Sequence, residues 1–175
     1  MSAWIKMISD EEASDDLKDV LSLARTPHGT VDNVMRVHSL RPNTMRGHLA
    51  IYRAALHDDT NKIPTWFQET ISSFVSILNK CEYSLANHWK NAAYLIGDNE
   101  KASKIKRALD KQKPEDAFDG KELEMLLYAK KLTLNPDKIV KSDVENLKKL
   151  SDAGNTNEAI KLLNNMVADY TKPQK

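Results

Sequence analysis

The stretch FQETISSFVSILNKCEYSLANH, residues 67–88, decides the fold. Its first half carries apolar side chains at positions i, i+4, i+7, i+8 and i+11, namely Phe67, Ile71, Phe74, Val75 and Leu78. Such a stripe is typical of an amphipathic α-helix that turns one face to a core. Pro64 precedes it in the first helical turn, where proline is favoured. We therefore predict a helix over residues 64–79, followed by a second helix around Cys81, the only cysteine in the chain.

The second helix is predicted to start at Asn79, because Asn is a good N-cap and Glu82 follows three residues later, as in a capping box. Cys81 is then the second residue of the helix, where the positive end of the helix dipole favours a thiolate. Cys81, Ser84 and His88 are spaced i, i+3 and i+7, so they share one face. Ser84 and His88 are four residues apart and within reach of each other.

Glu69 is expected to face His88 if the chain reverses near Asn79. Glu69 lies ten residues before this point and His88 nine residues after it. At about 1.5 Å per residue, both lie roughly 14–15 Å from the turn. A carboxylate facing an imidazole fixes its tautomer and raises its basicity. The spacing thus predicts a proton relay from Glu69 through His88 and Ser84 to the thiol. The alternative is that the cysteine is a small buried hydrophobe and the histidine a packed side chain.

The rest of the chain predicts an all-α fold of about seven helices, with no sustained alternation of apolar and polar residues. Ser9–Glu12 is expected to be a capping box that starts the first helix. A short helix over residues 31–37 is expected to end before Arg41-Pro42, and Asn43 to cap the next helix.

The C-terminal half predicts further helices around residues 123–129, 144–154 and 159–167. Residues 111–120 are expected to form an exposed connection. Two lysine-rich segments, residues 101–113 and 138–149, are expected to be solvated faces, because acidic residues are interleaved in both. The last residues, about 171–175, are expected to be a frayed tail.

Length and composition favour one compact domain over residues 1–175, with 41% hydrophobic and 29% charged residues. The net charge of +1 provides no field that attracts nucleic acid. No apolar run approaches the roughly 18 residues of a membrane helix, and the acidic N-terminus does not resemble a signal peptide. One cysteine forms no internal disulfide, which favours a reducing, cytoplasmic location.

The motif formed by Glu69, Cys81-Glu82-Tyr83-Ser84 and His88 resembles the signature Glu…Cys-x-x-Cys-x-x-x-His. That signature marks the alkylhydroperoxidase D and carboxymuconolactone decarboxylase superfamily. Residues 34–56, 67–88 and 150–160 are similar to its branch of uncharacterised peroxidase-related proteins. The resemblance implies an all-α fold, assembly into homo-oligomers (dimers, trimers or hexamers) and reduction of peroxides by a pair of cysteines.

Carried over to this sequence, the resemblance makes Glu69 and His88 the proton relay and Cys81 the resolving cysteine. Tyr83 occupies a position that is commonly aromatic or histidine, and we expect it to contact substrate. Ser84 stands where the family has its attacking cysteine. A serine hydroxyl does not pass through sulfenic acid and disulfide, so a dithiol cycle within one subunit is excluded. The sequence also lacks the aromatic last helix, with Asn and Arg, that the branch carries.

Three functions remain open. In the first, a one-cysteine peroxidase, Cys81 attacks a peroxide and an external thiol resolves the product. In the second, His88 and Glu69 perform acid–base chemistry on a small organic acid or lactone, whose carboxylate Arg41 or Arg46 holds. In the third, the chain is a non-catalytic oligomeric descendant of such enzymes.

Two other chemistries fit less well. A hydrolase triad of Ser84, His88 and Glu69 has suitable residue types, but a serine on a regular helix lacks the strained elbow of such enzymes. A metal site at Cys81, His88 and Glu69 has poor ligand spacing. We therefore expect a peroxidase-type oxidoreductase without cofactor or metal. Its partners are a small peroxide or organic acid and an external thiol reductant.

Overall fold

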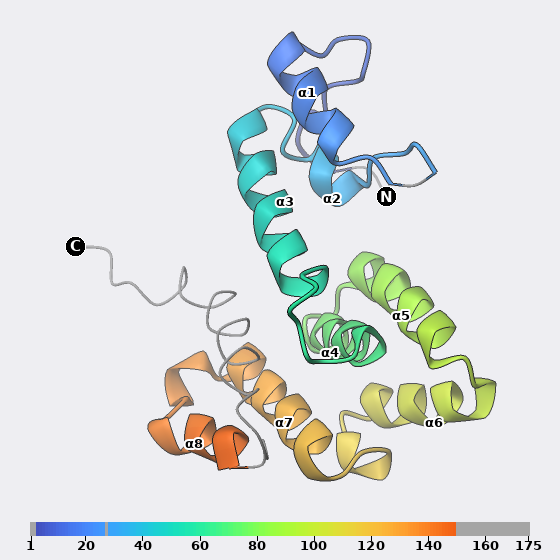
Figure 1. The fold of residues 1–175 in the computed structure, drawn as a ribbon, viewed down its shortest axis with the longest axis vertical. Helices are drawn as coiled ribbons and strands as arrows, with labels where there is room; N and C mark the ends of the chain where they lie inside the picture. Colours follow the sequence, from blue (N-terminus) through green and yellow to red (C-terminus); the bar gives the residue numbers. More distant parts are fainter. Residues whose placement is uncertain (1–2, 27, 150–175) are drawn as a thin grey trace. The chain divides into compact units, whose positions relative to one another are not determined.

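The computed structural model describes residues 3–26 and 28–149 (Figure 1). In these residues the helices are α1 (Asp15–Leu23), α2 (Asn33–Arg36), α3 (Pro42–Leu56), α4 (Thr65–Leu78), α5 (Glu82–Ile96), α6 (Asn99–Asp110), α7 (Gly120–Leu134) and α8 (Lys141–Lys149). Two short 3-10 helices, η1 (Pro114–Asp116) and η2 (Pro136–Lys138), lie between them. The extended structure recorded in these ranges is one isolated bridge between Arg25 and Val31. The prediction of an all-α fold is confirmed.

The chain forms two compact units, residues 1–59 and residues 60–175. The first contains α1 to α3 and the second α4 to α8. A single domain over residues 1–175 stays a prediction. Four expectations concern residues outside the described ranges. They are the helix over residues 159–167, the tail at residues 171–175, the resemblance in residues 150–160 and the missing last helix.

The helix starts in the first unit differ from those expected. Ser14 is the N-cap of α1 and its hydroxyl accepts a hydrogen bond from the Leu17 N–H at 3.3 Å. Ser9 accepts from the Glu12 N–H in a turn before the helix, so the predicted capping box does not start α1. Arg41 is the N-cap of α3, not Asn43, because the proline at the first helical position has no N–H to lose.

A chain of hydrogen bonds links the turn after α2 to α3. His38 Nε2 lies 2.9 Å from His48 Nδ1, and His38 Nδ1 lies 3.0 Å from the Thr44 hydroxyl. Thr44 donates its single proton to the Arg41 carbonyl at 2.8 Å, so it accepts from His38. A neutral His38 that donates from Nδ1 must accept at Nε2. The chain therefore runs in one direction, from His48 through His38 and Thr44 to the carbonyl.

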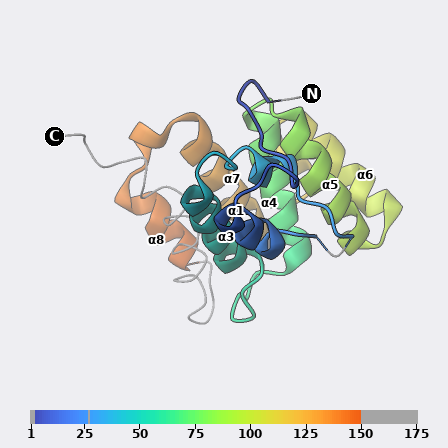
Figure 2. The ribbon, with the colours of Figure 1, turned by 90° about the horizontal axis from the view of Figure 1, so that it is seen from above.

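The second unit is built around α4, which contacts α5, α6 and α7 (Figure 2). Pro64 is the N-cap of this helix, one residue before the first turn. Four of the five predicted stripe residues face a core: Phe67, Phe74 and Leu78 are buried in it and Ile71 packs against it, whereas half-buried Val75 is not part of it. This core consists of Phe67, Phe74 and Leu78 of α4, Ile105 and Leu109 of α6, Phe118, and Leu126 of α7.

Two expectations for the second unit hold only in part. The lysine-rich segment 101–113 contains most of α6, whose Ala102, Ile105, Ala108 and Leu109 are buried. These apolar residues recur at helical spacing between the charged ones, so only the lysine side of the helix is solvated. The connection at residues 111–120 is mostly exposed, but Pro114 is buried and Phe118 is part of the core.

The histidine chain predicts that stability falls on mild acidification. Burial, and then the neighbouring His38, lower the pKa of His48 below its ordinary value of 6.5. The folded state thus favours neutral His48, and this contribution is complete above about pH 6.5 and is lost as the pH falls through the lowered folded pKa. We expect the free energy of unfolding, measured with urea between pH 7.5 and 5, to fall less steeply in His48→Gln than in the wild type, because the variant lacks this titrating group.

The matched control is His28→Gln, which removes an exposed histidine and should keep the wild-type slope. The Asp10 carboxyl does not interfere. Hydrogen bonds from Arg25 and Arg36 hold its pKa below 3.8, so the stability it contributes is lost only at lower pH. An unchanged slope in His48→Gln would contradict the prediction.

Candidate functional site

A tight turn joins α4 to α5. Lys80 adopts the left-handed conformation, with φ 55°. Its N–H donates to the Ile77 carbonyl at 3.0 Å, and the Cys81 N–H donates to the Ser76 carbonyl at 2.9 Å. This pair of bonds is the Schellman motif, which satisfies carbonyls at the end of a helix. The chain therefore reverses within a few residues, and α5 returns along α4.

The turn changes the role of Cys81. Asn79 is the C-cap of α4, not the N-cap of the next helix, so the predicted capping box with Glu82 is wrong. Cys81 itself is the N-cap of α5, and its side chain is exposed and makes no cap hydrogen bond. The described residues offer no acceptor to the N–H groups of residues 82–84. The sulfur thus stands where an N-cap side chain reaches free N–H donors at the positive end of a helix dipole.

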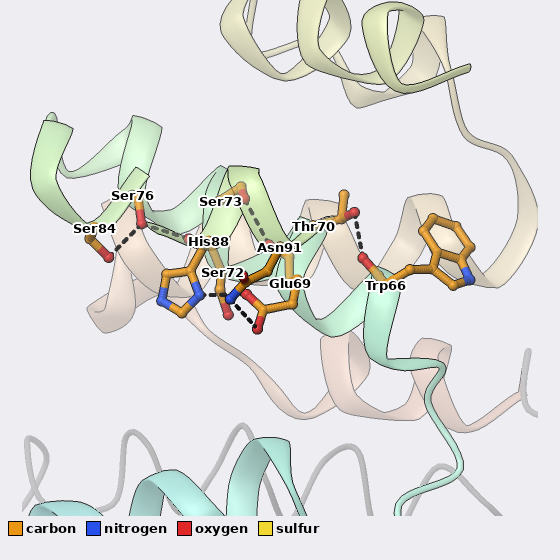
Figure 3. A network of polar contacts seen from close by, with 9 residues as sticks. All are labelled: Trp66, Glu69, Thr70, Ser72, Ser73, Ser76, Ser84, His88 and Asn91. Carbon is orange, nitrogen blue, oxygen red and sulfur yellow. Dashed lines mark hydrogen bonds and ion pairs between the residues drawn. The ribbon is translucent and has the colours of Figure 1, made fainter. Parts of the chain in front are cut away.

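Glu69 and His88 meet between α4 and α5, as the spacing predicted (Figure 3). Glu69 is 3% exposed, and its Oε2 lies 2.7 Å from His88 Nδ1. Asn91 Nδ2 donates to the other carboxylate oxygen at 3.4 Å, a long contact. An ionised carboxylate only accepts hydrogen bonds, so Nδ1 carries the proton of a neutral imidazole. The Nε2 lone pair of His88 is then available to accept a proton.

Ser84 is hydrogen-bonded to α4 rather than to His88. Its hydroxyl oxygen lies 2.9 Å from that of Ser76, which also lies 2.7 Å from the Ser72 carbonyl. A carbonyl only accepts, so the single proton of Ser76 goes to it and Ser84 donates to Ser76. Within the described residues, Ser84 forms no hydrogen bond to the His88 imidazole or to the Cys81 thiol. The line predicted from Glu69 to the thiol is therefore divided into two separate pairs.

Sequence reasoning missed the polar side of α4. Thr70 and Ser73 donate to the carbonyls four residues before them, each at 2.8 Å, as Ser76 does. Such back-bonding satisfies a hydroxyl within its own helix and lets it be buried. The serine and threonine residues between the apolar positions of residues 67–78 could have indicated this polar side. Asn91 left a similar signal, three residues after His88 on the same helix.

No protein-family model matches this sequence, and no curated protein matches it either. Solved structures do. An alkylhydroperoxidase core protein from Ralstonia eutropha JMP134, described as an uncharacterised peroxidase-related protein, is 17% identical with a TM-score of 0.71, over 98% of this chain and 92% of that one. An uncharacterised peroxidase-related protein from Silicibacter sp. TM1040 is 18% identical with a TM-score of 0.72, over 99% and 91%. The chain has the alkylhydroperoxidase core fold.

The structure gives no clear role to the remaining predicted residues, Tyr83, Arg41 and Arg46. Tyr83 is exposed in the first turn of α5, and its contact with substrate stays a prediction. Arg46 forms an exposed ion pair with Asp16 at 2.8 Å in the first unit, and its role in holding a carboxylate stays a prediction. Arg41 caps α3 in the first unit.

Among residues 3–26 and 28–149, no three His, Cys, Asp or Glu side chains are grouped as metal ligands would be. In the same ranges, no helix has both the length and the apolar character that crossing a bilayer demands.

The buried pair predicts a measurable loss of stability. His88→Ala leaves the Glu69 carboxylate buried with only the long Asn91 contact, which should lower the free energy of unfolding by about 1–3 kcal/mol. Adding Glu69→Gln to His88→Ala should recover part of this loss, since an unpaired amide is less costly to bury than a charge. Urea unfolding at neutral pH measures both. Asn87→Ala, at an exposed position one residue earlier, is the control. A His88→Ala variant as stable as this control would refute the account of the pair.

Proposed function

We propose that this protein is a one-cysteine thiol oxidoreductase that reduces peroxides at Cys81, with Glu69 and His88 supplying a proton. One observation carries the proposal: an exposed thiol stands at the uncapped start of the helix that also carries the carboxylate-bound imidazole. The fold shared with peroxidase-related proteins supports it. Assembly into a dimer, trimer or hexamer and a cytoplasmic location stay predictions.

The chemistry needs a peroxide and an external thiol. The Cys81 thiolate attacks one peroxide oxygen; an S–O bond forms, the O–O bond breaks, and the departing alkoxide takes a proton to become an alcohol. A first external thiol attacks the sulfenic acid and releases water, giving a mixed disulfide. A second releases the small-molecule disulfide and restores the thiol. Ser84 cannot serve as the resolving group.

His88 can supply this proton once its Nε2 has taken one up, for example the proton that the thiol loses, and it lies beyond Ser84 from Cys81. Cys81 and His88 are seven residues apart, about 10 Å along the helix, so the imidazole does not touch the thiol. Ser84 donates to Ser76 and keeps lone pairs that can accept from a substrate or from His88 when its Nε2 is protonated. A bulky organic hydroperoxide can span this gap better than hydrogen peroxide. We therefore propose organic hydroperoxides as the preferred substrates.

The test is the rate of Cys81 oxidation, followed by intact mass. We expect one oxygen atom per chain from one equivalent of cumene hydroperoxide, and none in Cys81→Ser. His88→Ala should slow the reaction by about 10²-fold, the usual contribution of a general acid, with a smaller effect on hydrogen peroxide. Ser84→Cys should give an internal disulfide in place of the added oxygen.

Asn87→Ala is the matched control and should react at the wild-type rate. The proposal fails if Cys81→Ser keeps full peroxide turnover with an external thiol. It also fails if Cys81 oxidises no faster than free cysteine, which is the outcome that a non-catalytic descendant predicts.

A second candidate is acid–base chemistry on a small organic acid or lactone. The observation that favours it is that the Glu69–His88 pair forms without any contact to Cys81. A neutral imidazole whose Nδ1–H is held by a carboxylate can remove a substrate proton at Nε2. Turnover that survives Cys81→Ser but is lost in His88→Ala would support this function in place of the first.

A further inference from the structure

A groove of about 450 Å³ lies between α5 and α6, away from the thiol. Its lining comes from facing rows of the two helices: Trp89 and Ala93 on α5, and Asn99, Ala102, Ser103, Lys106 and Arg107 on α6. The α5 pair is spaced i, i+4, and the α6 residues fall into the two rows 99, 103, 107 and 102, 106 with the same spacing.

The charges of the groove favour an anion. Lys106 Nζ is held by both Asp110 oxygens, at 2.6 and 2.8 Å, so its charge is largely compensated. Arg107 has no ion pair in the part of the chain that the structure describes, and no acidic side chain belongs to the lining. A guanidinium binds carboxylates through two parallel hydrogen bonds. Arg107 is therefore the group that an anionic ligand would contact.

The other wall favours a flat ring. Trp89 is half-buried and packs against the second unit's core, which fixes its indole. Lys106 Nζ lies 5.9 Å from the indole ring centre, at the edge of the cation–π range. Ala93 and Ala102 are small, so a planar group can approach the indole between the helices. Asn99 and Ser103 add hydrogen-bonding side chains along the same row as Arg107.

We propose that this groove binds an aromatic carboxylate, with its ring against Trp89 and its carboxylate on Arg107. The volume is in the range of small-molecule sites. The groove uses none of the residues assigned to peroxide reduction. Trp89 follows His88 directly, and one residue is about 100° around a helix, so the two side chains leave α5 in different directions. The proposal therefore stands or falls independently of the thiol chemistry.

The test uses NMR on the ¹⁵N-labelled full chain with 2-naphthoate as the probe and neutral 2-naphthalenemethanol as its uncharged analogue. We expect 2-naphthoate to shift the Trp89 indole N–H signal, assigned with Trp89→Phe, and the amide signals of residues 99–107, with saturation. Trp66 is an internal control, because a lysine also lies near its ring, with Lys101 Nζ 4.7 Å from the ring centre, but Trp66 does not line this groove. Its indole N–H signal should therefore not shift.

Arg107→Gln should weaken 2-naphthoate binding about tenfold or more, the loss expected for one charge-assisted pair. Lys104→Gln removes the same charge from an exposed position of α6 outside the groove, and should change the dissociation constant less than twofold. The amide spectrum of each variant reports whether it is folded. Any of three results overturns the proposal: no saturable shift, equal affinity for the neutral alcohol, or equal effects of the two substitutions in folded variants.

Discussion

The contact between Glu69 and His88 is the constraint on which the candidate site depends. A carboxylate that is 3% exposed is costly to bury, and the imidazole at 2.7 Å is what makes its burial tolerable. The contact fixes which turn of α5 lies against which turn of α4. With that register set, Ser84 falls opposite Ser76, and the chain reversal leaves Cys81 at the start of α5.

The helix α4 can support this contact because it has two different buried sides. Its apolar residues, among them Phe67 and Phe74, pack against α6 and α7 and drive the burial of the helix. Its hydroxyl side chains bond to carbonyls of their own helix, so a polar row can face α5 without unsatisfied groups. The site is thus a polar seam held in place by an apolar core.

Part of this arrangement can be predicted from the sequence. The apolar stripe of α4 and the equal distances of Glu69 and His88 from the turn are properties of helix geometry alone. The partner of Ser84 could not be found in this way, because spacing within α5 says nothing of which α4 side chain lies opposite. The N-cap was missed for a related reason: Asn79 suits both the end of one helix and the start of the next, and only the left-handed Lys80 decides between them. The buried side of α6 was hidden among its lysines, although its apolar period was present.

The most direct test of the account is the tautomer of His88, read by long-range ¹H–¹⁵N NMR at about pH 8, above the ordinary histidine range. The signal is assigned with His88→Gln. Because Glu69 Oε2 accepts from Nδ1, the account predicts a neutral ring protonated at Nδ1, with a bare Nε2. A ring protonated at Nε2, the form that free histidine prefers, would contradict the pairing and the relay built on it.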